Sequence, residues 1–333
     1  MAATTTGRGK NEYPLLVVAG PTASGKTALA LHLAEELGGE IVSCDSVAVY
    51  RLMEIGTAKP SLEERARVTH HCIDLYWPNE ACTAGDYARH AREAIAGIRQ
   101  RGRIPIVAGG TGLYLRALLE GLAPAPKRDD ALRERLRTRV ERKGSSWLHR
   151  VLQRLDPRAA ALIHANDVPK LIRSIEVTLT ARKPQTAQWQ AGRDPLRGYR
   201  ILQMGLAPQT SALQAAREIR AHLYERINHR AAAMFERGLL AETNMLRERF
   251  GDECRALGAL GYAQAMAVLR REITLDEAIA AAQQGHRNYA KRQGTWFRRE
   301  ASMQWLPGFG DDPEVQKAAL RLAQTLLSEG VKS

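Results

Sequence analysis

Residues 20–27 of this 333-residue chain have the composition and spacing of a phosphate-binding loop. Their sequence, GPTASGKT, fits the pattern GxxxxGK[ST] between a strand and a helix. In such a loop, backbone N–H groups and the helix N-terminus hold phosphate oxygens. Lys26 would reach the bridging and terminal oxygens, and the Thr27 hydroxyl would hold Mg²⁺. The alternative is a glycine-rich turn that matches by chance. The predicted phosphate site consists of Gly20, Pro21, Thr22, Ala23, Ser24, Gly25, Lys26 and Thr27.

The third predicted strand, residues 104–108, indicates that this loop need not bind a nucleoside triphosphate. In a P-loop NTPase such a strand ends in an Asp that holds Mg²⁺. Here it ends in Gly109, Gly110 and Thr111, and the sequence has no NKxD motif for guanine recognition.

Asp45 and Ser46 follow the second predicted strand, residues 41–44. The carboxyl ends of strands in an open α/β sheet form the edge at which ligands bind. A carboxylate there could accept a proton or hold Mg²⁺ through water. It could equally cap the next turn, and the residues alone leave both interpretations open.

Two basic segments could meet phosphates. Residues 285–299 carry five Lys or Arg and no acid, and Arg287, Lys291 and Arg298 fall within about 40° of one another on a helix. Arg226 and Arg230 lie four residues apart, so on a helix they point the same way and suit a diphosphate. The alternatives are a solvated basic face and a surface helix paired with nearby Glu residues.

These residues require an α/β fold to bring them together. Apolar runs at 15–19, 41–44 and 104–108 alternate with helical patterns at 27–37 and 87–101, which predicts a parallel sheet covered on both faces. We predict a P-loop NTPase-like parallel sheet core with a helical insertion domain and C-terminal helices that return to the core. The predicted boundaries are 11–122 and 205–310 for the catalytic core, 123–204 for the insertion that contacts tRNA, and 1–10 and 311–333 for peripheral tails.

Composition narrows the class of protein. A net charge of +13 and a pI near 9.9 suit a polyanionic partner, or simply a basic protein. No apolar run approaches the ~20 residues that span a bilayer, and the N-terminus lacks a secretory apolar region. The four cysteines form no CxxC pair or zinc spacing, so we expect reduced thiols in a cytoplasmic protein without a membrane partner.

Eight segments together resemble the tRNA dimethylallyltransferase (tRNA isopentenyltransferase) family of bacterial type. They occur in the family's order and span nearly the whole chain, and IGTAKP, GGTGLYL and AKRQGTWFR are its more specific motifs. The segments are GPTASGKT (20–27), DSVAVY (45–50), IGTAKP (55–60), GGTGLYLRALLEGL (109–122), IHANDVPKLIRSIEV (163–177), RINHRAAAMFERGLLAE (226–242), LGYAQ (260–264) and AKRQGTWFR (290–298).

The resemblance implies an enzyme that moves a dimethylallyl group from dimethylallyl diphosphate to N6 of the adenine 3' of the anticodon in tRNA, with Mg²⁺ as cofactor. It implies that Asp45 is the general base. The implied catalytic and diphosphate-binding residues include Thr22, Lys26 and Arg230. The implied tRNA-binding residues are Asp45, Ser46, Val47, Ala48, Thr111, Lys170, Arg173, Gly258, Gly261, Tyr262, Lys291, Arg292, Gln293, Thr295, Trp296 and Arg298.

The sequence also departs from the family pattern. Ala48 stands where many members have Gln, and Lys170 stands where Arg is usual, so a bidentate phosphate contact there is in doubt. We expect a monomer whose partners are the anticodon stem-loop of tRNA and dimethylallyl diphosphate. The alternatives are a small-molecule or nucleotide kinase on the same core, and a non-catalytic RNA-binding protein with a vestigial P-loop.

Overall fold

The computed structural model describes residues 12–189, 192–207 and 213–328. Contacts divide the chain into two units, a core of residues 1–119 and 196–333 and an insertion of residues 120–195. Among the described residues, no helix is both long and apolar enough to cross a membrane.

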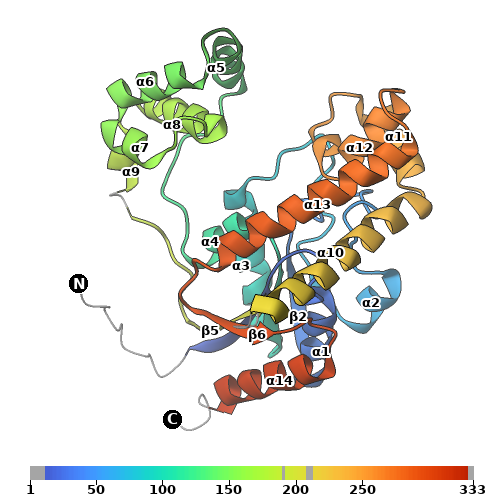
Figure 1. The fold of residues 1–333 in the computed structure, drawn as a ribbon. Coiled ribbons are helices and arrows are strands. Elements are labelled where there is room, and N and C mark those ends of the chain that lie inside the picture. Colours follow the sequence, from blue (N-terminus) through green and yellow to red (C-terminus); the bar gives the residue numbers. More distant parts are fainter. Residues whose placement is uncertain (1–11, 190–191, 208–212, 329–333) are drawn as a thin grey trace. The chain divides into compact units, whose positions relative to one another are not determined.

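A six-stranded parallel sheet forms the centre of the core (Figure 1). Its strand order is β3-β2-β4-β1-β5-β6. Ala19 pairs with Gly109, which in turn pairs with Cys44, so strands β1, β4 and β2 end at the same level. The loops that follow these three strands therefore start side by side. The strands are β1 (Tyr13–Ala19), β2 (Gly39–Cys44), β3 (His70–His71), β4 (Ile104–Gly109), β5 (Tyr199–Ala207) and β6 (Met303–Pro307).

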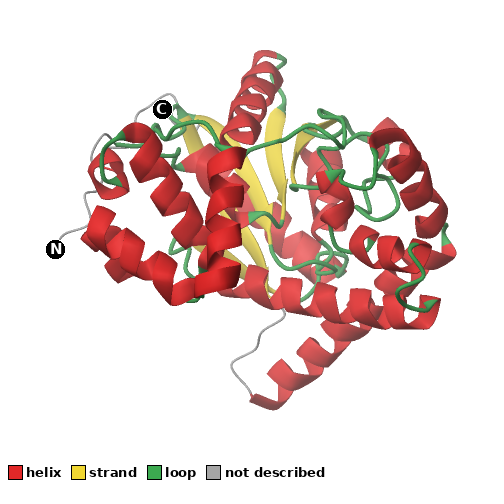
Figure 2. Ribbon diagram, turned by 90° about the horizontal axis from the view of Figure 1, so that it is seen from above, coloured by secondary structure: helices red, strands yellow, loops and turns green. Residues whose placement is uncertain are grey.

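Helices cover both faces of the sheet, as the alternating sequence pattern predicts (Figure 2). On one face lie α3 (Ala84–Gln100) and α4 (Gly112–Leu119), and on the other α1 (Lys26–Leu37) and α14 (Pro313–Ser328). Both α1 and α3 begin and end close to the predicted positions. Thr83 caps the start of α3, and Gly38 ends α1 in a left-handed conformation with φ 63°.

The C-terminal part differs from the predicted peripheral tail. Val315, Ala319 and Ala323 of α14 are buried against α1 and the sheet, so this helix belongs to the core. The burial follows from spacing, because these residues recur every four positions and form one apolar face.

The remaining core helices pack beside the sheet's carboxyl edge. Helix α10 lies along α13, and α11 and α12 pack together next to α13 (Figure 1). They share an apolar cluster with the loop after β2, which includes Met53. The remaining helices of the core are α2 (Leu62–Arg67), α10 (Leu213–Glu236), α11 (Leu239–Phe250), the 3-10 helix η1 (Arg255–Gly258), α12 (Tyr262–Leu269) and α13 (Leu275–Phe297).

The insertion is helical and has its own apolar core, which includes Leu148, Leu152 and Ile175. The predicted boundary at residue 204 needs correction, because β5 pairs with β1 and β6 and therefore belongs to the core sheet. The insertion helices are α5 (Asp130–Lys143), α6 (Ser145–Leu155), α7 (Pro157–Leu162), α8 (Val168–Ala181) and α9 (Gln185–Trp189).

Candidate active site

The glycine-rich loop connects β1 to α1, as the motif requires. Gly25 has φ 85°, and a Cβ atom there would lie 2.6 Å from the backbone nitrogen of Gly310, so only glycine fits. Lys26 opens α1 and donates through Nζ to the carbonyl oxygen of Pro21 at 2.6 Å. The ammonium group therefore lies within the loop.

Gln293 of α13 fixes the position of this loop. Its Oε1 accepts a hydrogen bond from the backbone N–H of Thr22 at 2.8 Å, and its Nε2 donates to the carbonyl oxygen of Gly110 at 3.0 Å. The side chain is buried. In this structure Gln293 therefore holds the loop in place, and its predicted contact with tRNA stays a prediction.

Asp45 follows β2 and lines a small cavity with Lys26 and Arg230. Its Oδ1 accepts hydrogen bonds from the backbone N–H groups of Val47 at 2.8 Å and Ala48 at 3.1 Å. The carboxylate thus caps the turn after β2 with one oxygen and also borders the cavity. The two interpretations left open by the sequence are compatible.

Thr111 holds the adjoining backbone. Its Oγ1 accepts a hydrogen bond from the N–H of Ser46 at 3.1 Å, while its own N–H donates to the carbonyl oxygen of Cys44 at 3.2 Å. Ala48 is buried and faces the small cavity. Its methyl group has no polar contact to offer a substrate.

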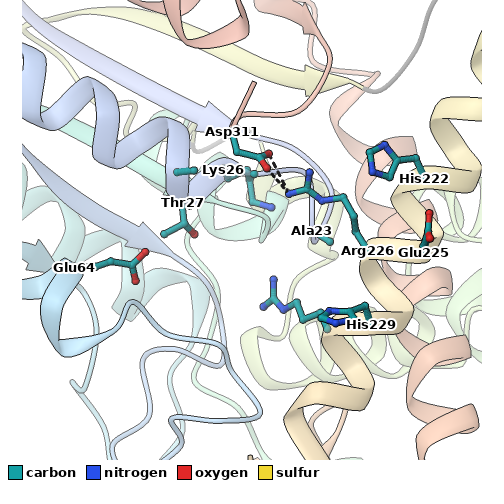
Figure 3. Close-up of a pocket in the computed structure, with 12 residues that line it drawn as sticks. Ala23, Lys26, Thr27, Glu64, His222, Glu225, Arg226, His229 and Asp311 are labelled. Carbon is teal, nitrogen blue, oxygen red and sulfur yellow. Dashed lines mark hydrogen bonds and ion pairs between the residues drawn. The ribbon is translucent and has the colours of Figure 1, made fainter. Parts of the chain in front are cut away.

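Two cavities meet at the glycine-rich loop. The small cavity encloses about 110 Å³ and also borders Tyr289 and Gln293. The large cavity encloses about 630 Å³ and is lined by the loop and one face of α10 (Figure 3). Lys26, Thr27 and Arg230 line both. A ligand with its anionic end on these cations could therefore extend into the small cavity toward Asp45.

The site holds an excess of positive charge. Burial and the nearby Arg230 guanidinium lower the pKa of Lys26 to about 7, although Asp45 acts to raise it. Burial also lowers the pKa of Arg230. The same two causes, burial and Arg230, bring the pKa of His286 down to about 4. Titratable groups perturbed in this way concentrate at binding and catalytic sites, and these favour an anionic ligand.

The described residues of the site offer one ligand for Mg²⁺, the Thr27 hydroxyl. Thr27 is exposed and lines both cavities. No group of three His, Cys, Asp or Glu side chains with metal-binding geometry occurs in the part of the chain that the structure describes. This donor set suits Mg²⁺, which commonly keeps waters and takes most of its other ligands from substrate phosphates.

The basic stripe predicted for α13 is exposed only in part, because Arg287 is partly buried and donates to the side chains of Asn228 and Gln284. Lys291, Arg292, Arg298 and Thr295 are exposed. Trp296 is partly buried. The Arg116 guanidinium lies 4.5 Å from its ring centroid, and the ring packs so closely on Gly112 that a Cβ atom there would clash.

The predicted tRNA-binding residues outside α13 have different environments. Tyr262 is fully buried and donates its hydroxyl to Glu242 at 2.6 Å, and Gly261 is buried beside it. The prediction of an RNA contact through the Tyr262 side chain is therefore wrong for this structure. Gly258 is exposed.

Two further predicted RNA contacts lie in the insertion. Lys170 is exposed and pairs with Asp167 at 2.5 Å. Arg173 donates to the buried carboxylate of Glu176 at 2.8 Å and to a backbone carbonyl, so two of its five N–H groups are used within the insertion.

Glu242 is a structural residue that the sequence analysis missed. Its carboxylate accepts hydrogen bonds from the backbone N–H groups of Glu54, Ile55 and Gly56, and so holds the loop after Asp45 against α11. A single acidic residue on a helix carries no local signal of such a role. Asp311, at the large cavity, was also missed because it lies in a segment predicted to be a tail.

Comparison with known proteins identifies the family. A family model described as IPP transferase matches residues 48–300, and one described as isopentenyl transferase matches residues 14–75. A tRNA dimethylallyltransferase from Koribacter versatilis is 56% identical over 311 residues, covering 93% of this chain and 98% of the relative. One from Solibacter usitatus is 52% identical and covers 94% and 99%.

The chain belongs to the tRNA dimethylallyltransferase family. Among solved structures, a full-length tRNA isopentenylpyrophosphate transferase from Bacillus halodurans is 35% identical, with a TM-score of 0.69 and coverage of 96% of this chain and 99% of the other. A eukaryotic dimethylallyltransferase acting on tRNA shares the fold with a TM-score of 0.76 at 24% identity. The predicted family, α/β fold class and prenyltransferase function are confirmed, and the kinase and non-catalytic alternatives are not supported.

Proposed function

We propose that this chain transfers the dimethylallyl group of dimethylallyl diphosphate to N6 of the adenine 3' of the anticodon in tRNA, releasing diphosphate. The proposal rests on the two cavities that share Lys26, Thr27 and Arg230 in their lining. Lys26 and Arg230 provide positive charge at both, and the Asp45 carboxylate borders the small one. A donor diphosphate on the cations would direct its allylic carbon toward the carboxylate.

In the proposed reaction a bond forms between N6 of adenine and the allylic carbon, and the bond from that carbon to the diphosphate oxygen breaks. Asp45 accepts the N6 proton, since the exocyclic amine is a poor nucleophile until it loses one. Lys26, Arg230 and the loop N–H groups stabilise the charge that develops on the leaving diphosphate. Thr22 positions the loop through its bond to Gln293.

We propose Mg²⁺ as the divalent cofactor, held by the Thr27 hydroxyl together with diphosphate oxygens and water. When bound, it would supply positive charge for the diphosphate oxygens.

On the RNA side, we propose that tRNA meets the exposed face of α13 through Lys291, Arg292, Thr295 and Arg298. In the insertion, exposed Lys170 remains a proposed contact. Beside the small cavity, which Ala48 lines, residues 46–47 and Thr111 are proposed to meet the adenine, which must leave its stack to enter.

Mass spectrometry of tRNA incubated with dimethylallyl diphosphate and Mg²⁺ tests the proposal directly. We expect a gain of one prenyl unit on one adenosine beside the anticodon, and none with Lys26→Ala. An unmodified tRNA under conditions where a characterised relative modifies it would contradict the proposal. ATP or GTP should not be hydrolysed, because no Asp follows β4. Steady phosphate release from ATP that depends on Lys26 would instead favour a kinase.

A further inference from the structure

The segment before α14 lies directly on the glycine-rich loop. The N–H of Gly310 donates to the carbonyl oxygen of Ser24 at 2.9 Å. A Cβ atom on Gly25 would lie 2.7 Å from a carboxylate oxygen of Asp311. The Ser24 side chain is fully buried, and its hydroxyl has no partner among the described residues. The phosphate loop is therefore covered on this side by protein.

An ion pair ties the same segment to α10 at the large cavity (Figure 3). Arg226 Nη2 lies 3.0 Å from both carboxylate oxygens of Asp311. The guanidinium carbon lies 4.5 Å from the ring centroid of Phe309, which also meets the ring of His222 at 4.9 Å. Arg226 is thus held by a carboxylate on one side and an aromatic ring on another.

Asp311 places a carboxylate in a cavity that is proposed to bind an anion. The cavity that it lines also contains Lys26 and Arg230. An entering diphosphate would meet a carboxylate already bound to Arg226, the cation one helical turn from Arg230. Two anions competing for one guanidinium cannot both form its strongest bidentate contact. The side chains of Arg226 and Asp311 are 30% and 47% exposed, so their exchange needs no unfolding.

We propose that Asp311 is an internal competitor of the diphosphate: it holds Arg226 in the empty site, yields it to the bound diphosphate, and takes it back when diphosphate leaves. This inference rests on the proposed function and adds a residue that sets the affinity for the donor's anionic end and for the diphosphate product. No covalent step is involved. Asp311 therefore weakens diphosphate binding, whereas Arg226 strengthens it.

Calorimetric titration with inorganic diphosphate tests this competition. Asp311→Asn keeps the side-chain shape but binds Arg226 weakly, so we expect diphosphate to bind about three- to fivefold more tightly, as expected for a partly exposed ion pair. Arg226→Gln should weaken binding. In Arg226→Gln/Asp311→Asn the gain from Asp311→Asn should disappear, since the carboxylate then has no guanidinium to withhold.

Glu225→Gln is the matched control. Glu225 lines the same cavity, and its substitution removes the same charge as Asp311→Asn. The structure shows no ion pair for Glu225 among the described residues. We expect a clearly smaller gain from this variant. Equal gains from Glu225→Gln and Asp311→Asn would overturn the proposal in favour of general electrostatics. Weaker binding by Asp311→Asn would also overturn it, because Asp311 would then position Arg226 for the ligand.

The wild-type titration separates this inference from the proposed function. Binding of diphosphate to wild type that is lost in Lys26→Ala supports the donor site. If wild type binds in this way and Asp311→Asn binds with unchanged affinity, only the competitor role fails. If wild type binds no diphosphate, the donor assignment fails, and the competitor role fails with it.

Discussion

Cations in the insertion and cations beside the glycine-rich loop have opposite environments. In the insertion, the fully buried carboxylate of Glu176 accepts hydrogen bonds from Arg133 at 2.7 Å, Arg173 at 2.8 Å and the N–H of Asp129 at 2.6 Å. Burial would raise the pKa of Glu176, but these arginines bring it below its usual value. The arginines therefore help to hold the insertion together.

Beside the glycine-rich loop, Lys26 and Arg230 lack such a partner, although Arg226 has one in Asp311. In the described part of the chain no carboxylate lies within ion-pair distance of Lys26 or Arg230, and the pKa of each is lowered. The contrast shows how to interpret a chain rich in arginine. A cation paired with a buried acid supports the fold, whereas uncompensated cations around a cavity indicate a site for an anion.

Removing the buried acid should have the largest effect. Glu176→Gln leaves Arg133 and Arg173 without their counter-charge, so we expect a loss of about 3 kcal/mol in unfolding free energy of the insertion. Hydrogen exchange over residues 120–195 would measure it. Diphosphate binding should not change. Glu134 provides the control because it belongs to an exposed ion pair. Glu134→Gln should lower the unfolding free energy by less than about 0.5 kcal/mol. Similar losses for both variants would show that the buried carboxylate of Glu176 stabilises the insertion no more than an exposed one does.

Asp45→Asn tests the acid that faces the uncompensated cations. It keeps the shape and a hydrogen-bond acceptor but cannot usefully take the N6 proton. We expect single-turnover prenyl transfer to slow by about a hundredfold or more, because general-base catalysis is worth roughly 10²–10⁴ in rate. The tRNA dissociation constant should change by less than about threefold. A near wild-type rate would exclude Asp45 as the base, and a wholesale loss of tRNA binding would make it a recognition residue.

The low pKa of Lys26 predicts a pH dependence. The empty site holds Lys26 half protonated near pH 7, while a bound diphosphate favours the charged form. Diphosphate affinity should fall by up to about tenfold per pH unit above 7, with proton uptake on binding. Lys26→Arg stays charged, so its profile should be flatter and corrects for titration of the ligand itself. Parallel profiles for the two proteins would show that Lys26 is not the titrating group.

The low pKa of Lys26 should also make the stability of the ligand-free protein depend on pH. Stability should rise with pH, whereas diphosphate affinity falls. A lysine whose pKa is about 7 in the folded protein and about 10.5 when unfolded binds fewer protons when folded. Stability therefore rises with pH between these values, and the penalty is complete below pH 7. Lys26→Met should raise the melting temperature at pH 6 and have less effect near pH 10. A melting temperature lowered at pH 6 would mean that the ammonium group stabilises the empty loop.

The smallest effect concerns the exposed face of α13. Lys291→Ala should weaken tRNA binding modestly and reduce the slope of log affinity against log salt concentration by about 0.7 to 0.9. Transfer at saturating tRNA should be unaffected. An unchanged slope would make this face a solvated surface without an RNA contact.

Much of the fold was predictable from the sequence because its signals are local. The apolar runs of β1, β2 and β4 and the motif between β1 and α1 are each contained in a few residues. The two-residue β3 is too short to show a pattern, and β6 has three exposed residues in five, which obscures its alternation. The apolar face of α14 consists largely of alanine, which gives a weak hydrophobic signal for a helix that is well buried.

The site was predictable where a motif carries its chemistry and not where a tertiary contact does. The structure brings part of the glycine-rich loop, Asp45 and Arg230 to one cavity, and their roles there stay predictions. The internal contacts of Gln293 and Tyr262 were not predicted, because their types fit a surface contact equally well and only packing shows that they are buried. The competing carboxylate of Asp311 depends on a contact 85 residues away along the chain, with Arg226.

The bond between Thr22 and Gln293 has a consequence for protein synthesis. It joins residues 271 positions apart, and the same amide holds the strand-end loop at Gly110. Until the ribosome reaches residue 293, the nascent chain contains the whole glycine-rich motif but not the side chain that anchors it. The growing polypeptide therefore lacks the finished glycine-rich loop until α13 has been synthesised and can fold onto it.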